Sequence, residues 1–295
     1  MKSPLVSVYI PTHNRCKLLK RAIKSVKEQT YPNIEIIVVD DGSSDGTERF
    51  MTDLSNNDHT INYIRLNVPH GANYARNKGV QASNGTFVTG LDDDDEMLPD
   101  RIAMFVENFN SEYAYICSRY YCIDDKNDKK IIFPGGVYGI ITLDDMLVAN
   151  ITGNQVFTTK QMYLDAGMFD ENLVAAQEYD LWIRMLKIKP KAKQLSVPLS
   201  NIYIHNEGRI SGSPKQKTGY LQCYFKHKNL MSREQRMSRI VTLKRLSNRW
   251  PPTTYRLIMV LQPKRTWPKQ FLEVFKQKIL FSISWLSNKM KGSKI

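Results

Sequence analysis

The stretch Thr89-Gly90-Leu91-Asp92-Asp93-Asp94-Asp95-Glu96-Met97-Leu98-Pro99 places five acidic side chains just after an apolar, β-branched run that ends at Thr89. Adjacent carboxylates repel one another, so a fold keeps such a cluster where a cation or solvent absorbs the charge. Hard divalent ions take oxygen ligands, often one or two carboxylates completed by water and substrate phosphates. The stretch therefore predicts a divalent-metal site at the end of a buried strand, with a solvated acidic turn as the structural alternative.

Two further polar clusters follow predicted strands upstream. The apolar runs at 5–10 and 34–39 each end in a polar turn, at Pro11-Thr12-His13-Asn14 and at residues 40–45. Apolar residues at helical spacing over 17–30 predict a crossover helix between the two runs, which implies a parallel sheet covered on both faces. Because the carboxyl ends of parallel strands form the ligand crevice, all three clusters are expected on one rim.

Other ligand motifs are absent or incomplete. The sequence has neither a Gly-x-Gly-x-x-Gly nor a P-loop pattern, so it does not indicate a dinucleotide site or an ATP-type phosphate cradle. Asp41-x-Ser43-x-Asp45-Gly46 imitates the start of a calcium-binding loop, but Thr52 stands where that loop requires a bidentate Glu.

Charge and composition describe an ordinary globular chain with a basic C-terminal part. The 295 residues are 42% hydrophobic and 24% charged, and the formal net charge is +13. Residues 1–225 carry 25 Lys and Arg against 27 Asp and Glu, whereas residues 226–295 carry 17 against 2. The basic charge belongs to the tail and is not evidence that the main part of the chain binds nucleic acid.

Cysteine usage and hydropathy predict the cellular location of the chain. Its four cysteines have no metal-like spacing and no signal peptide precedes Val6, which predicts a reducing, cytoplasmic environment. No apolar run reaches the roughly 18 residues that span a bilayer. The longest candidate, residues 279–286, has eight residues with two serines. The protein is therefore predicted not to be integral to a membrane, although it can lie on one.

A second acidic centre occurs at Gln177-Glu178-Tyr179-Asp180-Leu181-Trp182-Ile183-Arg184. Apolar residues spaced by three to four from Leu181 onward predict a helix whose first turn contains Glu178 and Asp180. Carboxylates are favoured there by unpaired amide groups, so helix capping is one interpretation. An ion pair between Asp180 and Arg184, one turn apart, is another.

Together, these residues resemble the family 2 glycosyltransferases of GT-A fold over about residues 4–215. The resemblance is carried by Val6-Ser7-Val8-Tyr9-Ile10-Pro11-Thr12-His13-Asn14-Arg15, Val38-Val39-Asp40-Asp41-Gly42-Ser43, Gly71 with Ala75-Arg76-Asn77, Leu91-Asp92-Asp93-Asp94-Asp95 with Pro99, and Gly167-Met168-Phe169-Asp170-Glu171 followed by Glu178-Tyr179-Asp180-Leu181-Trp182. It implies an α/β fold with a Rossmann-like, mostly parallel central sheet and helices on both faces.

The resemblance also implies roles for the residues on the rim. The nucleotide-sugar contacts would be Pro11, Thr12, His13, Asn14, Asp41, Arg76, Asp92 and Asp93, with the 11–14 turn and Asp41 at uracil and ribose and Arg76 near the diphosphate. Asp92 and Asp94 match the ends of the Asp-x-Asp motif, so they would hold Mn²⁺ or Mg²⁺. His205 is a further candidate ligand for the metal or the diphosphate, with a structural role as the alternative.

The resemblance leaves two candidates for the catalytic base. Family members commonly have a Glu-Asp pair where this chain reads Gln177-Glu178. Glu178 falls at the position of that Asp and is the preferred candidate, and Asp180 is the alternative. Thr152, Gly153, Asn154 and Trp182 are expected on the acceptor side. Transfer from a nucleotide diphosphate needs a metal to stabilise the leaving group and one base to deprotonate the acceptor hydroxyl, which predicts inversion at the anomeric carbon.

We expect a GT-A domain over residues 1–215, with a nucleotide-binding part at about 1–98 and an acceptor-binding part at about 99–215. Residues 216–295 would form a basic, mainly helical C-terminal region. Within it, Phe, Leu and Ile recur every three to four positions from Pro268 to Leu286 among lysines, a pattern that suits an anionic membrane surface. Packing of that helix on the main domain is the alternative.

The expected activity is transfer of a hexose from a UDP-sugar to a lipid-linked oligosaccharide or lipopolysaccharide acceptor, in bacterial surface polysaccharide synthesis. The expected location is the inner face of the plasma membrane, as a peripheral protein, with no nucleic-acid partner. Two other readings stay open from the residues: a nucleotidyltransferase, which also pairs Asp with Mg²⁺, and a non-catalytic basic membrane-binding protein with solvated acidic clusters.

Overall fold

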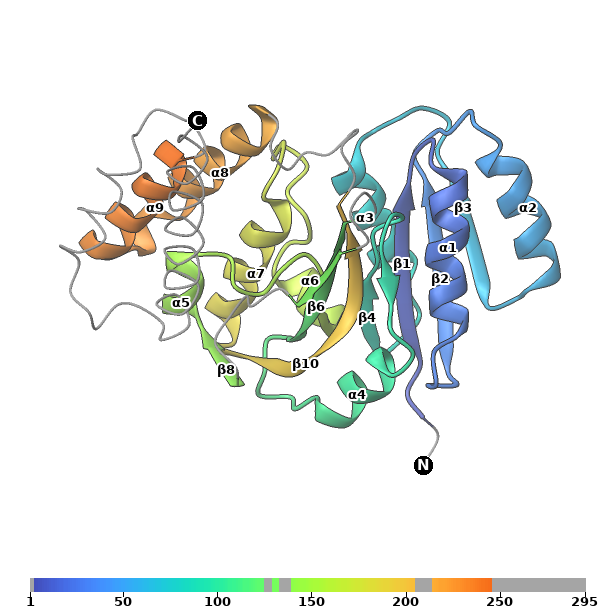
Figure 1. The fold of residues 1–295 in the computed structure, drawn as a ribbon, viewed down its shortest axis with the longest axis horizontal. Coiled ribbons are helices and arrows are strands. Elements are labelled where there is room, and N and C mark those ends of the chain that lie inside the picture. Colours follow the sequence, from blue (N-terminus) through green and yellow to red (C-terminus); the bar gives the residue numbers. More distant parts are fainter. Residues whose placement is uncertain (1–2, 125–128, 133–138, 205–213, 246–295) are drawn as a thin grey trace, which may run out of the picture. The chain divides into compact units, whose positions relative to one another are not determined.

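The structure of the protein is a computed structural model that describes residues 3–124, 129–132, 139–204 and 214–245. Its organising element is a mixed sheet with the strand order β3-β2-β1-β4-β9-β6-β10-β5, onto which β7 and β8 pair at β6 and β10 (Figure 1). The predicted α/β class is confirmed by this sheet and the helices that cover it.

The N-terminal half of the sheet is parallel. Its four strands are β1 (Val6–Thr12), β2 (Ile34–Asp40), β3 (Ile61–Arg65) and β4 (Phe87–Gly90). β1 lies between β2 and β4, and β3 pairs with the outer side of β2, all in the same direction. All seven residues of β1 are buried, as expected for a central strand of a sheet covered on both faces.

The C-terminal half of the sheet mixes directions. It consists of β5 (Glu96–Met97), β6 (Ile116–Asp124), β7 (Lys129–Ile132), β8 (Gly139–Thr142), β9 (Phe157–Thr159) and β10 (Lys191–Tyr203). The short strand β9 runs antiparallel to both β4 and β6 and so joins the two halves. β10, which the sequence pattern did not predict, is parallel to β6 and has register shifts around Pro198.

Helices cover both faces of the sheet and close two apolar cores. They are α1 (Cys16–Lys27), α2 (Thr47–Asn57), α3 (Ala72–Ala82), α4 (Arg101–Asn108), α5 (Leu143–Val148), α6 (Lys160–Asp165), α7 (Gln177–Ile188), α8 (Pro214–His227) and α9 (Arg233–Arg245), with the 3₁₀ turn η1 (Lys228–Leu230). Side chains of α1, α2 and α4 pack with Val6, Val8 and Ile10 of β1. Those of α3, α5, α6 and α7 pack with Tyr9 on the opposite face.

The C-terminal part of the described chain belongs to the same compact unit as the sheet. That unit extends to Ser247, so the predicted boundary at 215/216 falls inside it. Cys223 of α8 and Met231, which lies between η1 and α9, are both buried in the core that also contains α7. The amphipathic segment predicted at 268–286 lies outside the described residues. Within them, no helix combines the length and apolar character that crossing a membrane requires.

Candidate active site

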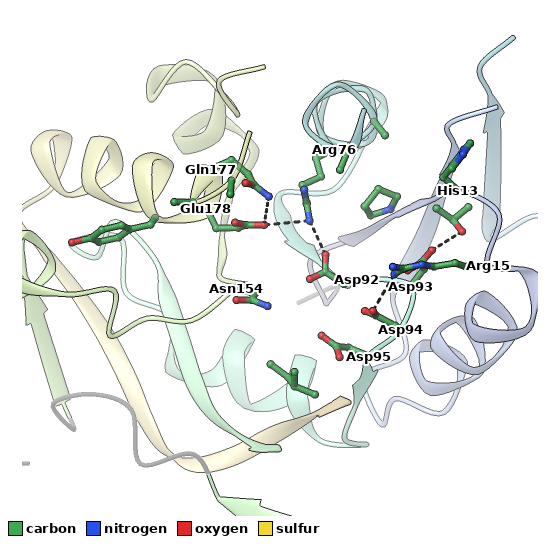
Figure 2. Close-up of a pocket in the computed structure, with 18 of the residues that line it drawn as sticks. His13, Arg15, Arg76, Asp92, Asp93, Asp94, Asp95, Asn154, Gln177 and Glu178 are labelled. Carbon is green, nitrogen blue, oxygen red and sulfur yellow. Dashed lines mark hydrogen bonds and ion pairs between the residues drawn. The ribbon is translucent and has the colours of Figure 1, made fainter. Parts of the chain in front are cut away.

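A cavity of about 420 Å³ opens at the carboxyl ends of β1, β2 and β4. The acidic run after β4 lines one part of it, and the N-terminal turn of α7 lines another (Figure 2). The residues after β1 and β2 also line it, so the three polar clusters predicted on one rim do meet there. Chain connectivity brings them together because parallel strands end at the same edge of the sheet.

Arg76 links the two acidic centres of the sequence. Its Nη2 lies 3.0 Å from Oδ1 of Asp92 and 3.2 Å from Oε1 of Glu178. Its side chain is only 8% exposed, so the guanidinium is a fixed counter-charge between two carboxylates that are 86 positions apart in the chain. Gln155 Nε2 also donates to Asp92 Oδ1, at 3.1 Å, and holds that carboxylate against the 150–155 loop.

Arg15 links the next two carboxylates of the acidic run. Its Nη1 lies 3.1 Å from Asp93 Oδ1 and 3.0 Å from Asp94 Oδ2, and Thr12 donates to the other oxygen of Asp93 at 2.7 Å. Burial raises the pKa of Asp93 to about 6 despite the opposing effect of Arg15. Asp95 points elsewhere along the cavity and accepts from the backbone N–H of Tyr203 at 3.1 Å.

Asp41 shapes the predicted nucleotide side. Its two carboxylate oxygens accept from the backbone N–H groups of His70 and Gly71 at 2.7 and 2.8 Å, which fixes the loop before α3. Pro11, Thr12 and His13 line the cavity beside it, and His13 Nδ1 contacts the Asp41 carbonyl at 2.7 Å. Asn14 does not line the cavity: it adopts φ 53° and bonds to Ser43 and Ser44. The structure therefore gives Asn14 a turn-forming role instead of the predicted donor contact.

Glu178 faces the cavity from the first turn of α7. Its carboxylate accepts from Gln177 Nε2 at 2.9 Å and from Arg76, and its side chain is 14% exposed. Burial raises the pKa of Glu178, Arg76 lowers it and Asp92 raises it again. The preceding N-cap residue, Ala176, has φ 59°, which costs a non-glycine residue on the order of 1–3 kcal/mol and persists where surrounding packing enforces it. That packing orients Glu178.

Asp180, the second candidate base, lies on another side of α7. It is fully buried and does not line the cavity. Its carboxylate contacts Arg184 at 2.8 Å, Lys226 at 3.0 Å and His227 at 2.7 Å. Hydrogen bonding to His227 and the charges of Arg184 and Lys226 outweigh burial and hold the pKa of Asp180 at about 2. This geometry argues against Asp180 as the base, because a base must reach the acceptor hydroxyl.

The residues expected on the acceptor side separate into two groups. Asn154 lines the cavity. Trp182 instead lies in the core with no exposed surface, and its Nε1 donates to the Gly153 carbonyl at 3.1 Å. Thr152 is 2% exposed, and Tyr115 OH contacts its hydroxyl at 2.9 Å. Packing removes the side chains of Trp182 and Thr152 from the cavity wall, so their expected acceptor contacts are corrected to supporting roles. Gly153 does not line the cavity, and its carbonyl accepts from Trp182.

Several site residues were not singled out from the sequence. Arg15 stands inside a quoted motif but has no assigned partner until the fold places Asp93 and Asp94 beside it. Gln216 and Tyr220 of α8 also line the cavity. Helix α8 lies beyond the motifs that carry the family resemblance. No sequence motif therefore predicted that its residues reach the cavity.

The acidic rim has the donor chemistry of a Mg²⁺ or Mn²⁺ site. Contacts within the described part of the chain use only Oδ1 of Asp92 and only Oδ2 of Asp94. Among the described residues, no group of three His, Cys, Asp or Glu side chains forms a complete metal cage. This fits an ion that binds one or two carboxylates and completes its shell with water and substrate phosphates. His205 lies outside the described residues.

This combination of fold and site defines a class of protein. The parallel half of the mixed sheet has an acidic run at its carboxyl rim, and a carboxylate on a helix faces that run across one cavity, as expected for the GT-A fold. The chain belongs to glycosyl transferase family 2, whose model matches residues 7–154. α7 and α8, which carry Glu178 and Tyr220, lie beyond the matched residues.

Bacterial relatives agree with this membership. The chain is 33% identical over 265 residues to the Escherichia coli K12 protein named as colanic acid biosynthesis glycosyl transferase WcaA, covering 88% of this chain and 93% of the relative. It is 30% identical over 239 residues to the GalNAc(5)-diNAcBac-PP-undecaprenol beta-1,3-glucosyltransferase of Campylobacter jejuni, covering 80% of this chain and 77% of the relative. The protein is therefore a glycosyltransferase similar to enzymes of bacterial surface glycans.

A solved structure has the same fold. The Staphylococcus aureus TarS fragment 1–349 in complex with UDP-GlcNAc superimposes with a TM-score of 0.63, over 83% of this chain and 72% of that one. The two are 18% identical, so the comparison concerns the fold alone. Family membership decides against the nucleotidyltransferase and non-catalytic readings that the residues alone left open.

Proposed function

We propose that the protein is an inverting, metal-dependent hexosyltransferase that uses a UDP-sugar and a lipid-linked oligosaccharide or lipopolysaccharide acceptor. One observation carries the proposal: Glu178 and Asp92 face one cavity from different elements and share Arg76 as their counter-charge. That arrangement brings a candidate base and a candidate diphosphate and metal site together. Both are required for transfer from a nucleotide diphosphate.

The donor side is assigned from the groove beside Asp41. His13, Asp41 and Ala72 line the cavity next to the acidic run, so a nucleoside there would place its diphosphate near Asp92 and Asp94. A UDP-hexose is the preferred donor because the Campylobacter relative is named as a glucosyltransferase and the TarS fragment was solved with UDP-GlcNAc. Arg76 contributes positive charge on the same side.

Asp94, with Asp92, would hold Mn²⁺ or Mg²⁺. When bound, such an ion stabilises the negative charge that develops on the departing diphosphate. Arg76 and Gln155 orient Asp92 through its Oδ1. Asp93 is already held by Thr12 and Arg15, which suits it to support the rim beside the donor.

Glu178 is the proposed base. A carboxylate with a raised pKa accepts a proton from the acceptor hydroxyl more readily than one at its ordinary value. Attack from the face opposite the diphosphate inverts the anomeric centre and needs only one such carboxylate. Of the other described carboxylates on the cavity wall, Asp41 accepts two backbone N–H bonds and Asp92 to Asp95 belong to the acidic run.

The acceptor side is assigned to the wall next to Glu178. Asn154 and the α8 residues Gln216 and Tyr220 line the cavity there, and the Tyr220 ring lies 6.2 Å from that of Tyr179. Aromatic and amide groups on one wall suit the apolar faces and hydroxyls of a sugar. A lipid-linked acceptor agrees with the undecaprenol-linked substrate named for the Campylobacter relative, and with the basic region after residue 247 as a peripheral membrane contact.

Calorimetric titration with UDP, with and without Mn²⁺, tests the donor site. Wild type is expected to bind UDP more tightly with Mn²⁺, and Asp94→Asn is expected to lose that gain while remaining folded. Asp53→Asn, which removes the same charge from an exposed position on α2, is the matched control and should behave as wild type. If the UDP affinity is the same with and without Mn²⁺ and is unchanged in Asp94→Asn, the metal site is removed from the proposal.

A further inference from the structure

Arg15 forms ion pairs on the acidic rim, and one of them uses Asp94, the proposed metal ligand. One of its nitrogens, Nη1, contacts both Asp93 and Asp94, at 3.1 and 3.0 Å. Figure 2 shows the guanidinium lying across the cavity edge between the two carboxylates. A cation of the protein itself thus sits at Asp94, the residue proposed to bind a divalent ion.

Arg15 and Arg76 differ in how firmly they are held. Arg76 is 8% exposed and bonds to carboxylates from two elements. Arg15 is 34% exposed, lines the cavity, and stands at the N-cap of α1, where it makes no side-chain capping bond. The pair that Arg15 forms with Asp94 is partly open to solvent, at 34% and 19% exposure, so water can solvate both charges when the contact is exchanged.

The positive charge of Arg15 competes with a divalent ion for Asp94. A guanidinium at about 3 Å neutralises the carboxylate that a divalent ion would use, and two cations on one carboxylate repel each other. Asp93 is the more buried partner, at 7% exposure against 19% for Asp94. Arg15 can therefore keep Asp93 while it releases Asp94.

The guanidinium of Arg15 can also bind phosphate oxygens. Its contacts with the rim come from a single nitrogen, so they do not use the two-pronged geometry with which guanidinium binds phosphate oxygens. The same cavity that Arg15 lines is the one proposed to hold the donor diphosphate. A diphosphate arriving there offers acidic oxygens to the guanidinium at the moment the metal takes Asp94.

We propose that Arg15 is a donor-binding residue that exchanges Asp94 for the diphosphate, and that this exchange couples metal binding to nucleotide binding. In the free protein Arg15 occupies Asp94 and weakens its affinity for a divalent ion. With nucleotide present Arg15 moves to the diphosphate and Asp94 becomes available. The proposal rests on Asp94 as the metal ligand assigned above.

Mn²⁺ binding without nucleotide gives the direct test, read from the electron paramagnetic resonance signal of free Mn²⁺. Arg15→Gln is expected to bind Mn²⁺ at least about fivefold more tightly than wild type, the lower end of coupling between linked sites. The gain in Mn²⁺ affinity on adding UDP is expected to be smaller in Arg15→Gln. By linkage, the gain in UDP affinity on adding Mn²⁺ must shrink by the same factor.

Arg21→Gln is the matched control. Arg21 is also on α1 and carries the same charge, but it contacts the Asp94 backbone carbonyl and lies 3.8 Å from Glu96. A general effect of net charge would tighten Mn²⁺ binding equally in both variants and would overturn the proposal. An unchanged Mn²⁺ affinity in Arg15→Gln would overturn it as well.

A labelling measurement on the wild-type chain does not depend on how the variants fold. Phenylglyoxal modification of Arg15, followed by peptide mass spectrometry, should increase with Mn²⁺ alone and decrease when UDP is added with Mn²⁺. Constant labelling would contradict the exchange. If wild type binds no Mn²⁺ even with UDP, the metal site itself fails; if it binds Mn²⁺ through Asp94 and Arg15 has no effect, only the exchange fails.

Discussion

Glu178 and Asp180 are separated only by Tyr179, yet the pKa of Glu178 is raised and that of Asp180 is lowered. Glu178 faces the cavity, where burial raises its pKa. Asp180 is buried against α8, and His227 and Lys226 of α8 together with Arg184 of α7 outweigh the effect of burial and lower its pKa to about 2. Helical geometry separates them, because residues two positions apart on a helix point in different directions.

Replacing Glu178 tests its role as the base. Glu178→Gln keeps the side-chain shape and is expected to lower kcat by about 10²- to 10⁴-fold, the range for losing a positioned base. UDP binding in the presence of Mn²⁺ should be retained, because the donor contacts are proposed on other elements. The measurement is UDP release from a UDP-hexose, with lipid-linked oligosaccharide from bacterial membranes as acceptor.

Asp180→Asn serves as the comparison. It removes the partner of buried charged groups, so it is expected to lower the free energy of unfolding by about 3–5 kcal/mol. Once folded at low temperature it should retain more transfer activity than Glu178→Gln. Full activity in Glu178→Gln, with loss confined to folded Asp180→Asn, would reverse the assignment of the base.

The pH dependence of kcat follows from the same side chain. Glu178 must be deprotonated to act, so activity rises as pH increases through its pKa, and the raised pKa places this acid limb above the ordinary range of a glutamate. Arg76 lowers the pKa of Glu178, so Arg76→Gln should move the limb to still higher pH. A limb that moves to lower pH in that variant would contradict the proposed coupling.

At the level of elements, the packing of α8 on the segment before α7 decides where Glu178 sits. Gly219 of α8 has no room for a side chain, because an added Cβ would lie 2.6 Å from Cα of Ala175. Ala176 follows in a left-handed conformation and α7 then begins at Gln177. Lys226 and His227, at the end of α8, contact Asp180. Backbone packing and charge thus hold the two helices together.

Gly219→Ala tests this contact. Alanine favours a helix by about 1 kcal/mol over glycine, so an isolated α8 would gain stability. In the folded protein the clash with Ala175 should outweigh that gain and lower the free energy of unfolding by about 1–3 kcal/mol, as overpacking does. Urea unfolding measures the difference, with Lys217→Ala on the exposed side of α8 as control.

The activity of Gly219→Ala shows whether the clash only lowers stability or also displaces Glu178. If α8 sets the place of Glu178, the folded variant should lose kcat while its UDP affinity is maintained. Equal stability and kcat in wild type and Gly219→Ala would mean that α8 does not constrain the turn before α7.

Element prediction from the sequence succeeded where periodicity was strong. The apolar runs of β1 and β2 and the amphipathic α1 appeared within a few residues of their predicted bounds. β10 was missed because Lys191, Lys193 and Pro198 interrupt its alternation, and the register shifts on either side of Pro198. Its formation depends on pairing with β6, a strand about 75 positions earlier, and no local pattern records that partner.

At the scale of the molecule, the described compact unit includes α8 and α9 and ends at Ser247. Arg239 of α9 is 1% exposed and lies over the Tyr179 ring at 4.7 Å, and Gln235 bonds to Asp144 of α5. The helices after the family-matched region are therefore part of the folded catalytic body.

Truncation tests this organisation. A chain ending at residue 247 is expected to fold cooperatively and to bind UDP, with a thermal midpoint within about 4 °C of the full chain, which corresponds to about 1 kcal/mol at this size. A chain ending at residue 213 should aggregate or unfold, because it exposes the core that Cys223 and Met231 help to close. Circular dichroism during heating distinguishes the two.

The same truncation addresses the membrane proposal. Residues 248–295 carry ten Lys and Arg against one Glu, so the chain ending at residue 247 is expected to lose sedimentation with anionic vesicles that the full chain shows. Neutral vesicles are the control for apolar attachment alone. Equal sedimentation of both chains with anionic vesicles would assign membrane contact to the shorter chain.

The sequence by itself determined the class of fold, the order of the first strands and the rim on which Asp41, Asp92 and Asp94 meet. Local periodicity reveals buried strands and helices, and the topology of parallel strands then brings their carboxyl ends together. It favoured Glu178 as the base but kept Asp180 as an alternative, because both carboxylates lie in the first turn of the same predicted helix.

Only the tertiary structure gave those two carboxylates different surroundings and brought the partners of the site together. Arg76 joins Asp92 to Glu178, Arg15 joins Asp93 to Asp94, and α8 supplies Tyr220 to the cavity while it encloses Asp180. Each contact links residues distant in sequence. Burial and charge environment are properties of such neighbours, so they exist only once the chain has folded.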